Sequence, residues 1–210
     1  MPRQMADLGY VFERRVEGAV DLALAGEQAR VHLPPMAGGS GFRIARLEYL
    51  YELAYLRMFV AWESFLEQTF YRYMCGSVST RFGQQTMVTG RYFRSTAAAE
   101  AVVLGGQAYK LWHNPTHVAG RVAAFVINGQ HEQLMNSASV RIGHMASLRH
   151  RIAHDQKDGA AKCDAATMYF AGRRYPAARP GRFLRDWDAH NRRQLERMKD
   201  ELIGLSKQIA

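Results

Sequence analysis

The sequence predicts an all-α fold, an up-and-down helical bundle with a long second helix and an irregular insertion around residues 76–95. Residues 42–75 carry apolar side chains at intervals of three and four, the spacing of one buried helix face. A later segment repeats this spacing with Val140, Met145, Leu148 and Ile152. With 210 residues the chain is long enough to bury a core as one domain, residues 1–210.

The first two predicted helices are separated by a segment rich in residues that break helices. Residues 5–29 alternate charged and apolar side chains and predict the first helix. Residues 31–41 contain two prolines and three glycines and predict a loop. The second helix, over 42–75, would be about 50 Å long if straight, so we expect a kink or an early end.

Shorter elements are expected along the rest of the chain. The segment 76–94 has β-like composition and predicts a hairpin or an extended loop. Prolines predict a turn at 176–181. The remaining predicted helices occupy 96–112, 117–128, 131–153, 160–173 and 184–207.

The charge of the chain favours an anionic partner, because the formal net charge is +9. The segment from Ala171 to Arg197 contains eight arginines and three carboxylates, a local excess of five positive charges. Aromatic residues are interleaved with these arginines. These aromatic residues are Tyr169, Phe170, Tyr175, Phe183 and Trp187. They either stack on unpaired bases of a nucleic acid or anchor the segment to the helical bundle.

Cysteine usage and hydropathy predict a cytoplasmic protein with no membrane partner. The two cysteines, Cys75 and Cys163, lie far apart in sequence, which fits a reducing compartment better than a disulfide scaffold. No stretch approaches the roughly 18 apolar residues of a membrane span, and the N-terminal residues lack the apolar run of a signal peptide.

The most informative segment is 145–155, MASLRHRIAHD, in which Arg149 and His154 are the candidate catalytic residues. An arginine offers a planar, charged fork suited to phosphate, and a histidine can gain or lose a proton near neutral pH. Residues five apart point about 140° apart on a straight helix, so we expect the helix to end between them or a partner molecule to complete the site. The same spacing recurs at Arg185 and His190, where we expect an ordinary charged helix start.

Residues near this motif suggest two further roles, metal binding and support of the catalytic pair. His150 and His154 are four apart and His144 is nearby, but no carboxylate is spaced as a third ligand, so we predict no metal site and no cofactor. Glu63, on the long helix, is a candidate supporting residue that pairs with Arg149 or orients His154. The alternative is a solvated glutamate on the helix surface.

The string LRHRIAHD resembles the signature of HEPN domains, in which an arginine and a polar residue are followed within a few positions by a histidine. Arg149 matches the arginine, His150 the polar residue and His154 the histidine. Residues 47–76, LEYLYELAYLRMFVAWESFLEQTFYRYMCG, are similar to the aromatic-rich long helix of prokaryotic members with its WExF-type core. The resemblance covers about half of the chain, and His150 replaces the commoner Asn or Asp.

The resemblance implies an all-α homodimer with two copies of the motif facing each other across a cleft. It implies a metal-independent endoribonuclease of a toxin–antitoxin or antiviral defence system, with RNA as substrate and an antitoxin protein as a possible partner. Some members of the family only bind nucleotides, RNA or partner proteins, and that is the alternative function.

The predicted mechanism uses the 2′-hydroxyl of the RNA as nucleophile. His154 takes its proton, Arg149 stabilises charge on the phosphoryl oxygens, and His150 or His154 of the partner subunit protonates the leaving 5′-oxygen. His150 is therefore a supporting residue. The predicted RNA-binding residues are Arg151, Arg173, Arg174, Arg182 and Arg185.

Overall fold

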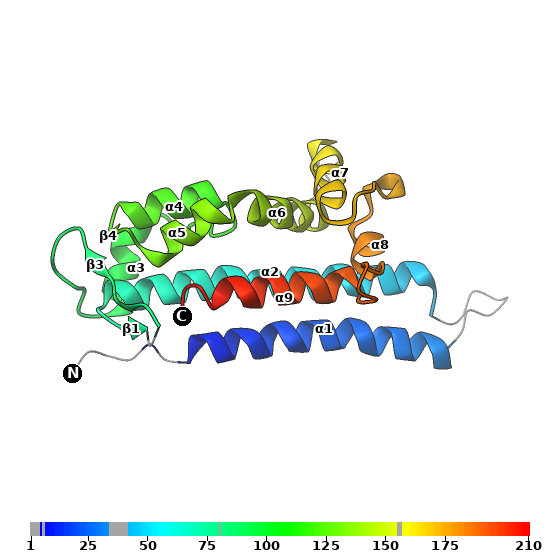
Figure 1. Ribbon diagram of the computed structural model, residues 1–210, viewed down its shortest axis with the longest axis horizontal. Coiled ribbons are helices and arrows are strands. Elements are labelled where there is room, and N and C mark those ends of the chain that lie inside the picture. The colour runs from blue at the N-terminus through cyan, green and yellow to red at the C-terminus, as the bar shows by residue number, and fades with distance from the viewer. Residues whose placement is uncertain (1–4, 6, 34–41, 80, 155–156) are drawn as a thin grey trace. The chain divides into compact units, whose positions relative to one another are not determined.

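The computed structural model is an all-α protein and describes residues 5, 7–33, 42–79, 81–154 and 157–210 (Figure 1). The long helices are α1 (Leu8–His32) and α2 (Ile44–Met74). None of the described helices has an apolar stretch long enough to cross a bilayer. The shorter helices are α3 (Thr96–Leu104), α4 (Pro115–Ala123), α5 (Gln130–Ser137), α6 (Ser139–Ala153), α7 (Lys157–Ala171), the 3-10 turn η1 (Pro176–Ala178), α8 (Pro180–Arg185) and α9 (Gln194–Ser206).

The chain forms two compact units. The first is drawn from residues up to Phe12, Trp62–Gly143 and Ile203–Ala210. The second is drawn from Glu13–Ala61 and His144–Leu202. The Arg149–His154 motif and the arginine-rich segment therefore both belong to the second unit, whereas Glu63 belongs to the first.

The core of the first unit is aromatic. Phe12 packs against Trp62 and Phe65, with ring centroids 5.9 and 5.0 Å apart. Trp62 and Phe65 of α2 are both buried. His131 is also buried here, and its Nε2 lies 2.8 Å from the Thr69 hydroxyl and 3.1 Å from the Leu66 carbonyl oxygen.

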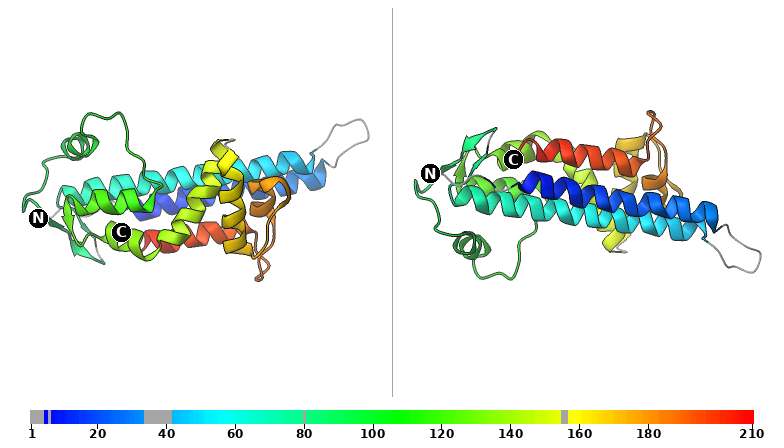
Figure 2. Two further views of the ribbon diagram at one scale, coloured as in Figure 1. Left: turned by 90° about the horizontal axis from the view of Figure 1, so that it is seen from above. Right: turned by 90° about the horizontal axis from the view of Figure 1, so that it is seen from below.

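The insertion that follows α2 contains short antiparallel pairs, as the composition of residues 76–94 predicts. Strand β1 (Val78–Ser79) forms a hairpin with β2 (Gly83–Gln84). Strand β3 (Thr86–Met87) pairs with β4 (Val126–Ile127), which joins the insertion to the segment after α4. Figure 2 shows α3 carried on the long connection between β3 and α4.

The second unit packs α8 directly on α2. A Cβ at Gly181 would lie 2.4 Å from the Glu48 carbonyl oxygen, so the position has room for glycine alone. The Gly181 amide donates to Glu52 Oε1 at 2.9 Å. Further along α2, the buried Tyr55 hydroxyl donates to the Met145 carbonyl oxygen at 2.8 Å and fixes α6.

Helix boundaries account for most differences from the sequence predictions. The second helix does not end early, because α2 continues to Met74. The first helix extends to His32, beyond the predicted 29, and most of the predicted loop lies outside the described residues. The predicted helix 96–112 ends at Leu104, where Gly105 adopts the left-handed conformation and caps it.

Two predicted helices prove to be pairs of helices. The segment 131–153 is divided at Ala138, whose φ of −111° and ψ of 14° leave the helical region. The segment 184–207 is divided by an irregular stretch between α8 and α9. There the Asp188 carboxylate accepts from the amides of His190 and Arg192, and Asn191 has a positive φ of 58°, which is a side-chain-stabilised turn rather than a helix start.

Candidate functional site

The Arg149–His154 motif lies at the C-terminal end of α6. His150 and Arg151 occupy the last turn, Arg149 directly precedes it, and His154 follows the final helical residue, Ala153. The helix thus ends between Arg149 and His154, one of the two arrangements expected from their spacing. The His154 amide still donates to the His150 carbonyl oxygen at 2.9 Å, so this backbone hydrogen bond fixes the positions of the two histidines relative to each other.

The two histidines of this turn are neighbours in space. The ring centroids of His150 and His154 are 5.0 Å apart, with an interplanar angle of 51°. His154 is exposed, whereas Arg149 and His150 are half-buried. The turn therefore presents one accessible imidazole with a second imidazole beside it.

Arg151, in the last turn of α6, interacts electrostatically with one residue of α2 and one residue of α7. Glu52 is half-buried, and burial raises the pKa of its carboxyl group, an effect that the Gly181 amide and the charge of Arg151 oppose. Burial raises the pKa of the Cys163 thiol to about 11, so this buried cysteine is not a thiolate nucleophile at neutral pH. Arg151, predicted to bind RNA, thus lies close to two groups of the protein itself.

His144, considered above as a metal ligand, packs against α7. Its ring stacks on Tyr169 with centroids 4.5 Å apart, and burial lowers its pKa. Across the described parts of the chain, no group of three or more His, Cys, Asp or Glu side chains could hold a metal ion.

Glu63 has a partner within the first unit. Its Oε1 lies 3.0 Å from His113 Nδ1, and its side chain is 18% exposed. The alternative of a solvated surface glutamate is therefore wrong. Its role beside Arg149 or His154 stays a prediction.

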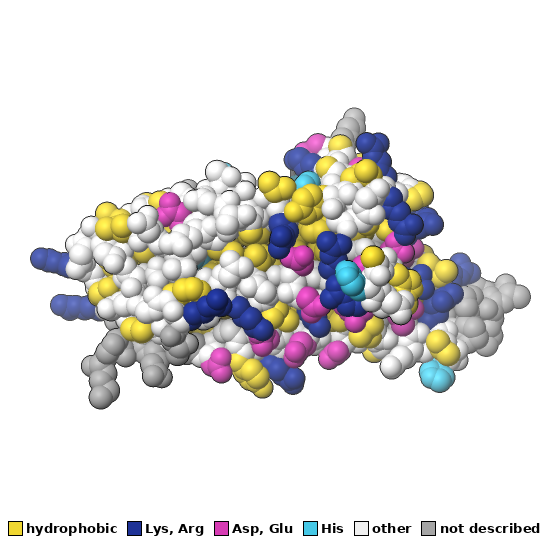
Figure 3. Space-filling view, in the orientation of Figure 1, with side chains coloured by type: hydrophobic (Ala, Val, Ile, Leu, Met, Phe, Trp, Pro, Cys, Tyr) yellow, Lys and Arg dark blue, Asp and Glu magenta, His cyan; other side chains and the backbone are white. Residues whose placement is uncertain are grey.

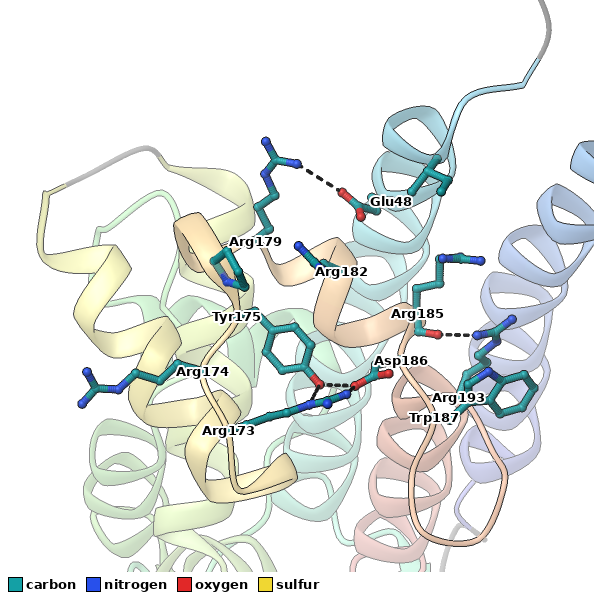
Figure 4. Close-up of a pocket in the computed structure, with 12 residues that line it drawn as sticks. Glu48, Arg173, Arg174, Tyr175, Arg179, Arg182, Arg185, Asp186, Trp187 and Arg193 are labelled. Atoms are coloured by element: carbon teal, nitrogen blue, oxygen red, sulfur yellow. Dashed lines mark hydrogen bonds and ion pairs between the residues drawn. The ribbon is translucent and has the colours of Figure 1, made fainter. Parts of the chain in front are cut away.

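The arginine-rich segment builds a cavity of about 670 Å³ in the second unit, which we call the arginine cavity (Figure 4). Four of the five predicted RNA-binding residues line it, and only Arg151 does not. Two lining arginines, Arg179 and Arg193, were not singled out, although both belong to the group of eight. The arginines that line the cavity are Arg173, Arg174, Arg179, Arg182, Arg185 and Arg193.

Charged and aromatic neighbours fix one wall of the arginine cavity. The Tyr175 hydroxyl and the Arg173 guanidinium both donate to Asp186 Oδ2, and Arg173 Nε donates to the Tyr175 oxygen at 3.1 Å. Figure 4 shows Tyr175 between Arg173, Asp186 and Arg182. Although burial raises it, the pKa of Asp186 is held below its usual value by hydrogen bonds from Tyr175 and Arg173, so the carboxylate stays charged.

A second network fixes the wall near α1. Glu27 Oε1 accepts from the Tyr51 hydroxyl at 3.1 Å and from Arg185 Nε at 2.9 Å, and lies 3.0 Å from Arg193 Nη2. The Arg193 guanidinium also lies 3.8 Å from the centroid of the Trp187 ring. One carboxylate therefore positions two arginines and, through one of them, the indole.

The aromatic residues of this segment divide between the two predicted roles. Phe170, Tyr175 and Phe183 are buried and anchor the segment, as one alternative predicts. Tyr169 and Trp187 are 47% and 50% exposed, and the Tyr169 ring stacks on His144. Figure 3 shows Lys and Arg side chains gathered over α7 and α8 on the face that this view displays.

In comparisons with known proteins, no protein-family model, curated sequence or solved structure matches this chain. The fold and the site define an all-α protein with a paired-histidine turn at the end of α6 and an arginine-lined cavity in the same unit.

Proposed function

We propose that this protein is a metal-independent endoribonuclease that uses the 2′-hydroxyl of its substrate as the nucleophile. The observation that carries the proposal is the pair of imidazoles at the end of α6, with the ring centroids of His150 and His154 5.0 Å apart and Arg149 directly before His150 in the helix. Transesterification of RNA needs a proton acceptor and a proton donor, and two neighbouring imidazoles supply both.

Each group has one role in the proposed reaction. His154, the exposed histidine, removes the proton of the 2′-hydroxyl, and the oxygen attacks the adjacent phosphorus. The P–O5′ bond breaks, and His150 or His154 of the partner subunit gives a proton to the leaving oxygen. Arg149 stabilises the negative charge on the phosphoryl oxygens through its fork of N–H donors. The products are a 2′,3′-cyclic phosphate and a 5′-hydroxyl.

The biological setting is proposed from the HEPN resemblance. It places the protein in the cytoplasm as a homodimer with the motif at its interface, acting as a toxin held by an antitoxin protein or in antiviral defence. The arginine cavity supports RNA as the substrate class, because arginines with interleaved aromatic residues suit phosphates and unpaired bases.

A second candidate is a non-catalytic module that binds RNA, a nucleotide or a partner protein. The arginine cavity favours it, because its lining includes neither Arg149 nor His154 and so does not depend on catalysis. In this case replacing His154 leaves binding intact, and there is no cleavage to lose.

The experiment that tests the proposal is incubation of purified protein with mixed cellular RNA in EDTA. We expect the wild type to cut RNA and both Arg149→Ala and His154→Ala to lose cutting. His190→Ala is the matched control, because His190 lies at the same spacing from an arginine but in the turn after α8. Intact RNA in the presence of folded wild-type protein would favour the binding module.

A further inference from the structure

The arginine cavity keeps a large positive charge after its own carboxylates are counted. Its lining contains six arginines and two acids, Glu48 and Asp186. Glu27 adds a third negative charge through its contacts with Arg185 and Arg193. Six minus three leaves a charge of +3 at one concave site, which favours an anionic ligand.

Three of these arginines can turn toward a ligand without breaking a close contact. Arg174 and Arg182 make no hydrogen bond or ion pair with another described residue, and both are exposed. The Arg179 Nη1 atom lies 3.8 Å from Glu48 Oε2. This ion pair is weak, because the Arg179 side chain is 59% exposed. Figure 4 shows no dashed line at Arg174 or Arg182 and a single one from Arg179, to Glu48.

The remaining wall is held in place before any ligand arrives. Tyr175 and Asp186 fix Arg173, and Glu27 fixes Arg185 and Arg193. Preorganised donors lower the entropy cost of binding. Trp187 is half exposed beside Arg193 and offers an indole surface to an aromatic group of the ligand.

We propose that the arginine cavity binds the terminal phosphate of an RNA strand, with the terminal base near Trp187. A terminal phosphate monoester carries about −1.5 to −2 charges at neutral pH, whereas each internal phosphodiester carries one, so concentrated positive charge favours the end of a strand. A volume of about 670 Å³ is within the range of small-ligand pockets, which fits one terminal nucleotide. This inference rests on the proposed function only in taking RNA as the ligand.

The test measures binding with RNA that cannot be cut. Single-stranded 2′-O-methyl oligonucleotides of one sequence carry a 5′-phosphate, a 3′-phosphate or hydroxyls at both ends, and their affinities are compared by fluorescence anisotropy in EDTA. We expect at least tenfold tighter binding for one of the phosphorylated ends, since several charged hydrogen bonds are gained. Inorganic phosphate is expected to compete with that oligonucleotide.

Substitutions assign the preference to the cavity. The double variant Arg174→Ala/Arg182→Ala is expected to lose the preference for the phosphorylated end, while Arg57→Ala, an exposed arginine of α2 outside the cavity, keeps it. Equal affinity for all three oligonucleotides in the wild type, or a preference that survives the double variant, would overturn the proposal. Because the oligonucleotides lack a free 2′-hydroxyl, these outcomes are independent of whether the protein cleaves RNA.

Discussion

His150 and His154 place their imidazole rings 5.0 Å apart in the turn that ends α6. The contact depends on the helical hydrogen bond from the His154 amide to the His150 carbonyl oxygen, which continues past the last residue of the helix. It makes His150 the nearest candidate for the second proton-transfer group of the proposed reaction.

We expect His150→Ala to lower the rate of RNA cleavage by about 10² to 10⁴, the usual contribution of a general acid or base. The double variant His150→Ala/His154→Ala should be no slower than the worse single variant, because residues that act as a unit are not additive. Single-turnover rates on one RNA substrate measure both effects. If His150→Ala cleaved RNA at the wild-type rate, a group other than His150 would be the proton donor.

Gly181 lies where α8 packs on α2. We expect Gly181→Ala to lower the free energy of unfolding by about 1–3 kcal/mol, because the new Cβ would meet the Glu48 carbonyl oxygen at 2.4 Å. Urea unfolding followed by circular dichroism measures the change. Gly204→Ala in α9 is the control, since its Cβ would meet nothing within 4 Å, and it should be neutral or stabilising by up to about 1 kcal/mol. Equal effects of the two substitutions would contradict the packing described here.

His131 makes the stability of the protein depend on pH. Burial lowers its pKa from 6.5 to about 3, and its Nε2 contacts Thr69 and Leu66 in the neutral form. The unfolded chain therefore takes up this proton first as the pH falls, so stability is lost from about pH 6.5 downward at about 1.4 kcal/mol per pH unit.

The variant His131→Gln removes this titration. Between pH 7 and pH 5, we expect the wild type to lose about 2 kcal/mol more unfolding free energy than the variant does. Denaturant unfolding of both proteins at the two pH values gives the difference. Parallel losses in both proteins would mean that His131 is not buried as a neutral imidazole.

Glu27 is the only described carboxylate that contacts both Arg185 and Arg193. We expect Glu27→Gln to lower the free energy of unfolding by about 1–3 kcal/mol, because two arginines and the Tyr51 hydroxyl lose a charged acceptor. Glu17→Gln is the control, since Glu17 makes an exposed contact with Arg14 at 3.6 Å, and it should change stability by less than about 1 kcal/mol. If both variants were equally stable, the Glu27 network would contribute nothing to the wall of the arginine cavity.

The long helix and its core were predictable because one periodic signal determines both. The apolar spacing predicts a helix over residues 42–75, and the observed bounds of α2 differ from this prediction by two residues at the start and one residue at the end. The buried face of this helix includes Trp62 and Phe65. A hairpin after α2 was also predictable, since β-like composition follows the end of the helix.

The interruptions of the later helices were not predictable from periodicity. The turn at Asp188 depends on a carboxylate that caps two backbone amides and on the positive φ of Asn191. Both residues are also compatible with a helix start. The break at Ala138 has no glycine or proline to mark it, and it separates α5 from α6 only through backbone angles.

The arginine-rich character of the candidate site was predictable from the sequence, but the side chains that contact these arginines were not. The excess of arginines between residues 171 and 197 lies in the segment that lines the arginine cavity, and four of the arginines predicted to bind RNA are among its lining residues. The partners that fix the cavity come from distant helices, as Glu27 and Glu48 do, and no local pattern connects them to the segment. For the same reason the contact of Glu63 with His113 could not be foreseen.

The most direct test of the proposed reaction is cleavage of a short RNA in which one nucleotide at a time carries 2′-deoxyribose, with mass spectrometry of the product ends in EDTA. The mechanism predicts 2′,3′-cyclic phosphate and 5′-hydroxyl ends, and loss of cleavage only where the deoxynucleotide lies directly 5′ to the scissile phosphate. Cleavage that continues at the substituted position, or a product with a 5′-phosphate end, would contradict it.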